Sequence, residues 1–317
     1  KTQFAVQAQV GHPCAELSCT FSLLALPHPA SGKSLADVEK IIRDTLVEFE
    51  QRGVEEDDLL KVKAEMEASF VFGLQSVSGK VSQLAANQTF SNNPNYIAQD
   101  IARYNNVTKE DVMRVFKKYI KDQHGVIMSV VPDGQLNSIS AENNFVPGPR
   151  SAGGESSTSA DELAVRKGTD SFDRSLIPPS GATEAVDIPE MWRRNFDNGI
   201  SILGTQSLET PTTSLLLKIS AGHYFNAKDK AGTAALLASM FGESTTERSA
   251  EEMSKALQKL GSSVTISAGN HYLNVNVNAL TKNLDATLSL VNEQIRAPAF
   301  LESEFERLKN NAIQSAL

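Results

Sequence analysis

A long stretch without apolar periodicity divides this sequence into two blocks. Residues 134–190 contain the runs GGESSTS (153–159) and PPSG (178–181) and little apolar repetition at helix or strand spacing. Connections of this length are uncommon inside a compact domain, so we interpret the stretch as an inter-domain linker. The sequence therefore predicts one domain over residues 1–133, a linker over 134–190 and a second domain over 191–317.

The linker prediction implies an order of cleavage by trypsin. Little burial protects a segment rich in Gly, Ser and Pro, so trypsin should cut near Arg150, Arg166 or Lys167 before it cuts either block. Limited digestion followed by mass spectrometry of the products measures this order. Degradation of both blocks while these three sites stay intact would show that the segment is not a linker.

Charge and hydropathy exclude two classes of partner. The chain has 30 basic and 38 acidic residues, which gives a net charge of -8 at pH 7. Binding to nucleic-acid phosphates needs a basic surface, so we expect no nucleic-acid partner. No apolar run approaches the length that spans a bilayer, so we expect no membrane span.

Capping residues and apolar spacing predict most elements of the first block. Ser34 suits an N-cap with Asp37 three residues later, and Gly53 ends the apolar pattern that follows. The acidic run at 55–58 suits the positive end of a second helix, and Thr108 suits the cap of a later one. We predict strands over 16–26 and 124–132, and helices between 34 and 53, from 55 onward, through 81–84 and over 109–120.

The two cysteines, Cys14 and Cys19, lie close together in the sequence. An odd spacing on one strand places two side chains on opposite faces, so we expect no disulfide between them unless a turn intervenes. The simpler expectation is that both are small, buried apolar side chains.

The second block begins with a strong hairpin signal. The tripeptide DNG at 197–199 separates strand-like segments at 192–196 and 200–203, and Asn-Gly supplies the positive φ angles of a tight turn. Ser249 suits the N-cap of a later helix. We predict further strands over 213–220, 263–268 and 272–280, and helices over 230–241, after 249, over 284–296 and from 302 onward.

The two blocks share a local pattern. Residues 54–63 (VEEDDLLKVK) and 300–309 (FLESEFERLK) match in their acidic positions, their apolar positions and their final lysine. Each segment follows a strand and an amphipathic helix in the same order, which predicts a duplicated domain. Strands and helices that occur in blocks, without regular alternation, predict layers of the α+β class.

Residues 221–241 (AGHYFNAKDKAGTAALLASMF) carry the most informative motif, because they resemble the zinc-helix region of the pitrilysin/insulinase peptidases. In that family a strand ends near a Gly, a short loop follows, and a helix opens with the inverted motif H-x-x-E-H. The two His, one helical turn apart, bind zinc, and the Glu between them is the general base for the metal-bound water. A Glu on a later helix supplies the third ligand.

The residues that would perform this chemistry are missing from the matching positions. The two His positions hold Ala235 and Ser239, and the Glu position holds Ala238. The third-ligand position falls near Ser315 or Ala316, again without a carboxylate. The resemblance therefore implies a vestigial zinc motif, with no catalytic residue and no metal ligand in this chain. An Ala- and Leu-rich core helix without that ancestry would show the same periodicity.

The first block resembles the other half-domain of the same family. The match covers Leu35 to Gly53, the acidic helix that follows, and FGLQS at 72–76. The family's domain begins some tens of residues earlier and carries a substrate-contacting Arg and Tyr segment there. We therefore expect the first domain to be truncated at its start and the second at its end, within a longer protein.

The resemblance also implies a fold and a function. The fold would be duplicated, processing-peptidase-like domains, each with a mainly antiparallel sheet and helices on one face. The full-length protein would be a zinc-dependent metallopeptidase that hydrolyses peptide bonds, with its zinc in an N-terminal domain or a partner subunit outside this chain. This chain, inactive alone, would form the opposing wall of a chamber that encloses extended peptides, with the linker as the hinge.

Two further expectations accompany this interpretation. The family-level expectation for location is periplasmic or otherwise exported, and the expected partner is the catalytic half of the same chain or a partner subunit. The alternative function is a non-enzymatic binding or scaffold subunit of the same fold, as in respiratory-complex core proteins. A catalytic motif in the full-length protein, or its absence, separates the two functions.

Overall fold

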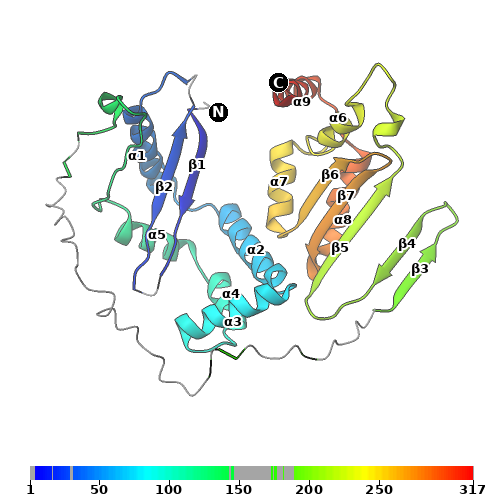
Figure 1. Ribbon diagram of the computed structural model, residues 1–317, viewed down its shortest axis with the longest axis horizontal. Helices are drawn as coiled ribbons and strands as arrows, with labels where there is room; N and C mark the ends of the chain where they lie inside the picture. Colours follow the sequence, from blue (N-terminus) through cyan, green and yellow to red (C-terminus); the bar gives the residue numbers. More distant parts are fainter. Residues whose placement is uncertain are drawn as a thin grey trace. The chain divides into compact units, whose positions relative to one another are not determined.

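The computed structural model describes residues 4–15, 17–28, 31–142, 144–145, 173, 175–176, 181 and 189–316 (Figure 1). Within it the chain forms two compact units, each built from separate segments. The first unit comprises Lys1–Gln7, Ala25–Glu39 and Met128–Gln206, and the second comprises Ala8–Leu24, Lys40–Ile127 and Ser207–Leu317.

These units divide the chain differently from the predicted domains at 1–133 and 191–317, and the predicted domains stay a prediction. Most of the predicted linker lies outside the described residues, and so do the predicted trypsin sites at Arg150, Arg166 and Lys167.

The first unit contains the hairpin that the DNG tripeptide predicts. Strands β3 (Met191–Asn195) and β4 (Ser201–Thr205) pair antiparallel around it. Gly199 in the turn has a φ of 84°, which a residue without a Cβ adopts freely. Gly204 lies against Trp192, because a Cβ at residue 204 would stand 2.4 Å from the indole ring. The predicted hairpin is confirmed.

A second hairpin joins β1 (Ala5–Gly11) and β2 (Ser22–Pro27), and the boundary between the units runs through both strands. At its tip Cys14 and Cys19 face each other as an antiparallel bridge and form a disulfide, with both residues exposed. The expectation of two buried thiols on opposite faces of one strand was wrong. The strand predicted over 16–26 begins only at Ser22, so a turn brings the two cysteines together.

The strand predicted over 124–132 is also wrong. These residues are described, but none of them pairs in a sheet. Val126 is 99% exposed, and Met128 and Val130 are largely exposed as well. The apolar, β-branched composition favours a strand, but a strand also needs a partner edge, and none of the described strands supplies one here.

The predicted helices of the first block are confirmed. They are α1 (Leu35–Arg52), α2 (Glu56–Gly73), α3 (Val77–Ser91) and α5 (Lys109–Tyr119), while α4 (Ile97–Asn105) was not predicted. The Ser34 hydroxyl accepts the Asp37 N–H at 3.1 Å, and the Asp37 carboxylate accepts the Ser34 N–H at 2.9 Å. Thr108 and Asp111 form the same reciprocal capping box at the start of α5.

The second unit holds a three-stranded antiparallel sheet in the order β5-β7-β6. Its strands are β5 (Thr212–Ile219), β6 (Ser263–Ala268) and β7 (Leu273–Leu280). Leu273, Val275 and Val277 of the central strand alternate with asparagines and are all buried. Since alternate residues of a strand share a face, one face of the sheet is apolar.

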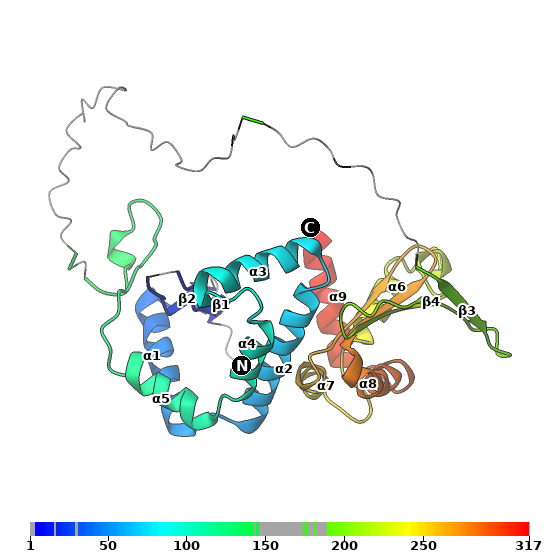
Figure 2. The ribbon, with the colours of Figure 1, turned by 90° about the horizontal axis from the view of Figure 1, so that it is seen from below.

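Helices cover the apolar face of this sheet. Helices α6 (Thr233–Met240), α7 (Ala250–Lys259) and α8 (Leu284–Arg296) pack against it, and α9 (Glu302–Ala316) packs against α6. Ala238 of α6 and Val291 of α8 belong to the same buried cluster as the β7 side chains. Figures 1 and 2 both show α8 lying along the sheet. The α+β class is therefore confirmed.

Ser249 caps α7 as predicted. Its hydroxyl accepts the Glu252 N–H, and the Glu252 carboxylate accepts the Ser249 N–H at 2.9 Å. This backbone hydrogen bond, followed by one from the Ser249 hydroxyl, lowers the pKa of the Glu252 carboxyl. Among the helices that the structure describes, none is long and apolar enough to cross a membrane.

The order of elements agrees with the repeated sequence pattern. In the first block β1, β2, α1 and α2 follow one another, and in the second β6, β7, α8 and α9 do so. The matched segments begin the corresponding helices, since α2 starts at Glu56 and α9 at Glu302. Superposition of the two sets of elements is the remaining part of the duplication hypothesis and stays a prediction.

A partly buried polar network connects α8 to the segment before α7. The Thr245 hydroxyl donates to the Glu293 carboxylate at 2.6 Å and accepts the Arg248 backbone N–H at 2.9 Å. The Arg248 guanidinium pairs with the same carboxylate, whose side chain is 10% exposed. A buried carboxylate is tolerated only when it is paired and hydrogen-bonded, so these contacts account for its position.

Candidate functional site

Helix α6 is the segment in which the sequence places the vestigial zinc motif. It begins at Thr233 rather than at the predicted residue 230, because Gly232 has a φ of 92°, outside the helical region. The side chain of Asn226, in the preceding loop, accepts the Ala234 N–H at 3.0 Å. One of the free N–H groups in the first turn is thus satisfied by a side chain from outside the helix.

The three motif positions lie on two different faces of α6. Ala235 and Ser239 are exposed, and the Ser239 hydroxyl donates to the Ala235 carbonyl oxygen at 3.1 Å. Ala238 is 4% exposed and belongs to the core cluster with Val275 and Val291. The two positions that hold His in the resembling motif therefore face outward, and the position that holds Glu faces the core.

The residues present at these positions do not fit a zinc ion. Zinc sites in proteins use thiolate, imidazole and carboxylate ligands, and Ala235 and Ala238 have no donor atom. The Ser239 hydroxyl is already bonded to the helix backbone. On α9 the Ser315 hydroxyl donates to the Asn311 carbonyl oxygen at 2.9 Å, and the Ala316 side chain lies outside the described part of the chain.

The loop before α6 carries a histidine that does not serve this site. The His223 N–H donates to the Gly269 carbonyl oxygen at 3.0 Å, which fixes the loop against the β6–β7 turn. The Tyr224 ring lies 4.6 Å from the His271 ring, centroid to centroid. Neither histidine belongs to a set of three possible metal ligands among the described residues.

A cluster that the sequence reasoning missed lies at the tip of the β1–β2 hairpin. His12, Cys14 and Cys19 place their ligand atoms within 4.8 Å of one another, and all three residues are exposed. The signal that could have found it is the short spacing H-x-C followed by a second Cys five residues later. That spacing fits two sides of one tight turn, whereas we read the cysteines on a single strand.

The face of the sheet opposite the core is polar. Asn274, Asn276 and Asn278 alternate with the buried residues of β7 and therefore project to this side. The exposed residues paired with them are Ser267, Thr265 and Ser263 on β6, and Lys218, Leu216 and Ser214 on β5. The Ser214 hydroxyl donates to the Asn278 side-chain oxygen at 2.8 Å. A row of amides, which both donate and accept hydrogen bonds, thus lies between two rows of mainly polar residues.

A cavity of about 390 Å³ lies beside α8. Arg248, Glu293 and Arg296 are among its lining residues. None of the motif positions at Ala235, Ala238 and Ser239 contributes to the lining. The cavity is therefore separate from the vestigial motif and belongs with the Glu293 network.

Comparison with known proteins gives one family match. Residues 202–316 match the model of the insulinase family, peptidase family M16. A curated relative, the mitochondrial-processing peptidase subunit alpha-1 of Dictyostelium discoideum, is 29% identical over 107 residues. The aligned part covers 34% of this chain and spans 16% of the length of that subunit.

Two solved structures show a partial likeness. The inactive domain of a peptidase M16 from Pseudomonas fluorescens gives a TM-score of 0.37 at 20% identity, covering 38% of this chain and 30% of that one. A protease from Helicobacter pylori gives 0.38 at 19% identity, covering 41% of this chain and 31% of that one.

Proposed function

We propose that residues 202–316, which match the model of the insulinase family, peptidase family M16, form a non-catalytic domain of a zinc-peptidase-like protein. In this proposal the segment contributes structure and peptide contacts to a larger assembly. The chemistry of peptide hydrolysis would take place elsewhere, at a zinc ion held by another domain or by a partner subunit.

The state of α6 is the observation that carries the proposal. The family's zinc helix needs two imidazoles and a carboxylate, and the matching positions hold Ala235, Ala238 and Ser239. Ala238 is packed into the core of the sheet, where a carboxylate would have no partner. The helix retains its place against the sheet without any of the groups that the reaction requires.

The polar face of the sheet supports a role as a wall that contacts extended peptides. An extended peptide presents N–H and C=O groups along its length, and primary amides can satisfy both kinds. Asn274 and Asn276 are partly exposed on the central strand, and no side-chain hydrogen bond to either is found among the described residues. The net charge of -8 further favours peptides that are basic.

A peptide-binding measurement tests whether the polar face of the sheet contacts extended peptides. Replacing both Asn274 and Asn276 with Thr keeps strand propensity but removes two amides, so binding of an unstructured basic peptide should weaken roughly tenfold. Fluorescence anisotropy with a labelled peptide measures the Kd, and Asn310→Thr, at an exposed position on α9, is the matched control. Equal Kd values for the double variant and the control would contradict the proposal that the polar face of the sheet binds peptides.

We propose that the catalytic half of the same protein, or a partner subunit, faces the polar sheet, and that residues 134–190 act as the hinge. We also propose an exported location, periplasmic in a bacterium. The Cys14–Cys19 disulfide supports this location, because disulfides persist in oxidising compartments. Cell fractionation with an antibody to the chain tests the location, and recovery in the cytosolic fraction would contradict it.

A further inference from the structure

We propose that the tip of the β1–β2 hairpin is a redox-gated zinc site formed by His12, Cys14 and Cys19. When the two cysteines are oxidised, their disulfide closes the site. When they are reduced, the two thiolates and the imidazole bind one Zn²⁺. This inference does not depend on the proposed function, because the hairpin lies outside the segment at 202–316 and shares no residue with α6.

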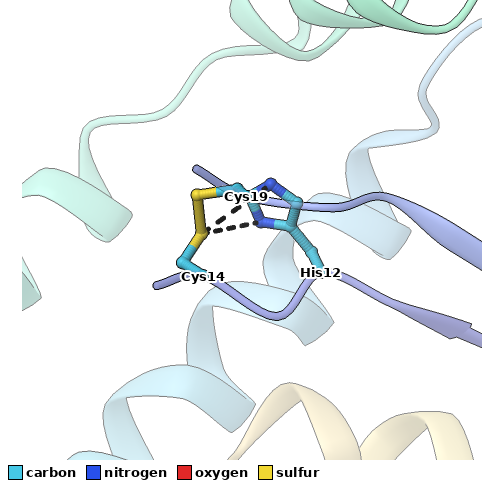
Figure 3. Close-up of side chains that lie close together, drawn as sticks. All are labelled: His12, Cys14 and Cys19. Carbon is cyan, nitrogen blue, oxygen red and sulfur yellow. Dashed lines mark hydrogen bonds between the residues drawn. A yellow bond between two sulfur atoms is a disulfide. The ribbon is translucent and has the colours of Figure 1, made fainter. Parts of the chain in front are cut away.

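The three side chains already lie together. The Cys14 sulfur is 3.9 Å from Nδ1 and 4.0 Å from Nε2 of His12, and Figure 3 shows the imidazole beside the disulfide. In a tetrahedral zinc site, with bonds of 2.3 Å to sulfur and 2.0–2.1 Å to nitrogen, a sulfur and a nitrogen ligand lie about 3.6 Å apart. The separation is already close to this value, and rotation of the imidazole would turn one of its nitrogens toward an ion shared with the Cys14 sulfur.

Backbone hydrogen bonds, in addition to the disulfide, hold the two cysteines opposite each other. The Ala15 N–H donates to the Ser18 carbonyl oxygen at 2.9 Å, inside the turn. The Thr20 N–H donates to the Pro13 carbonyl oxygen at 3.0 Å, on the other side of the pair. Reduction breaks the sulfur–sulfur bond but leaves both hydrogen bonds, so the two thiols remain facing each other.

The donor set favours a thiophilic ion. Two thiolates and one imidazole suit Zn²⁺, whereas Mg²⁺ and Ca²⁺ prefer oxygen ligands. On metal binding the two sulfurs would separate to about 3.8 Å, which an exposed turn can accommodate without disturbing a core. Three protein ligands leave the fourth zinc position open to water, and the exposure of all three residues gives the ion access.

Opening and closing the site is a two-electron thiol–disulfide exchange at Cys14 and Cys19. A dithiol reductant attacks the exposed disulfide. The two sulfurs of the reductant become joined in a disulfide, and Cys14 and Cys19 become thiols. Zn²⁺ then displaces the two thiol protons and binds the thiolates together with neutral His12. A disulfide oxidant reverses the sequence, since the cysteine sulfurs re-form their bond, two electrons pass to the oxidant, and the ion is released.

Spectroscopy with Co²⁺ as a stand-in for Zn²⁺ tests the site in the whole chain. After reduction with a phosphine, titration with Co²⁺ should give thiolate-to-metal charge-transfer absorption that saturates at one ion per chain. Zn²⁺ should displace it, and oxidation should abolish it. The oxidised chain and the C14S/C19S variant should show no such absorption. Absorption of equal strength in that variant, or none in the reduced chain, would overturn the proposal.

Two single histidine variants test whether His12 is the third metal ligand. His12→Ala should weaken Co²⁺ binding at least about tenfold, because one of three ligands is lost. His124→Ala removes an exposed histidine outside the hairpin and should leave the affinity unchanged. If the two variants bound Co²⁺ equally well, His12 would not be a ligand and the three-residue site would be wrong.

Discussion

Replacing Ala238 with glutamate is expected to lower the free energy of unfolding by roughly 3–5 kcal/mol, because an unpaired carboxylate would enter an apolar core. Ala238 is 4% exposed and packs in the cluster with Val275 and Val291. Urea unfolding followed by circular dichroism measures the loss. The loss should shrink at low pH, since burial raises the pKa of a carboxyl and the protonated form costs less to bury.

The matched control places the same charge on the other face of the same helix. Ala235→Glu keeps the substitution and the helix but lies at an exposed position, so it should change stability by less than about 0.5 kcal/mol. The double variant A235H/S239H should also fold, because both positions face outward. If A238E were as stable as A235E, Ala238 would not be a core residue and our description of α6 would be wrong.

Replacing Glu293 with alanine should produce the second large effect, a loss of roughly 2–3 kcal/mol. The Glu293 carboxylate accepts a hydrogen bond from Thr245 and pairs with Arg248, and hydrogen bonds to charged groups contribute more than neutral ones. A double-mutant cycle that combines Glu293→Ala with Thr245→Val isolates the coupling free energy between the two side chains. This energy should be about 1 kcal/mol or more. Equilibrium unfolding of the two single variants and the double variant gives this value.

Glu247 provides the control for this network. Its carboxylate lies 3.8 Å from the Arg248 guanidinium, but its side chain is 68% exposed. Exposed ion pairs contribute little, so Glu247→Ala should cost less than about 0.5 kcal/mol. Equal losses for E293A and E247A would show that the network acts as an ordinary surface ion pair.

Helix starts and strand alternation were predictable because they depend on local chemistry. Ser34, Thr108 and Ser249 each have a carboxylate three residues later, and all three form capping boxes. The strands predicted over 263–268 and 272–280 are present as β6 and β7. In each case the residues that determine the element lie within a few positions of one another.

Features that depend on distant partners were not predictable in the same way. The segment at 124–132 has the composition of a strand, but whether it pairs depends on a second strand far away in sequence. The Cys14–Cys19 disulfide depends on where a turn falls, and we placed a strand across it. In both cases local composition was used to decide a question of pairing.

The candidate site was partly readable from the sequence. The motif spacing identified Ala235, Ala238 and Ser239, and residues one helical turn apart share a face, which correctly groups the first with the third. The sequence did not tell which face is buried, because Ala and Ser are compatible with either. The contacts of Ala238 with β7 and α8 settle that question.

The zinc content of the C14S/C19S variant tests the central claim most directly, because that variant keeps α6 and removes the hairpin site. The variant would be incubated with Zn²⁺ and desalted. The number of zinc ions per chain would then be measured by inductively coupled plasma mass spectrometry. We predict far less than one zinc per chain, since α6 offers no imidazole, thiolate or carboxylate at Ala235, Ala238 or Ser239. One tightly held zinc per chain in this variant would contradict the proposal that residues 202–316 form a non-catalytic domain.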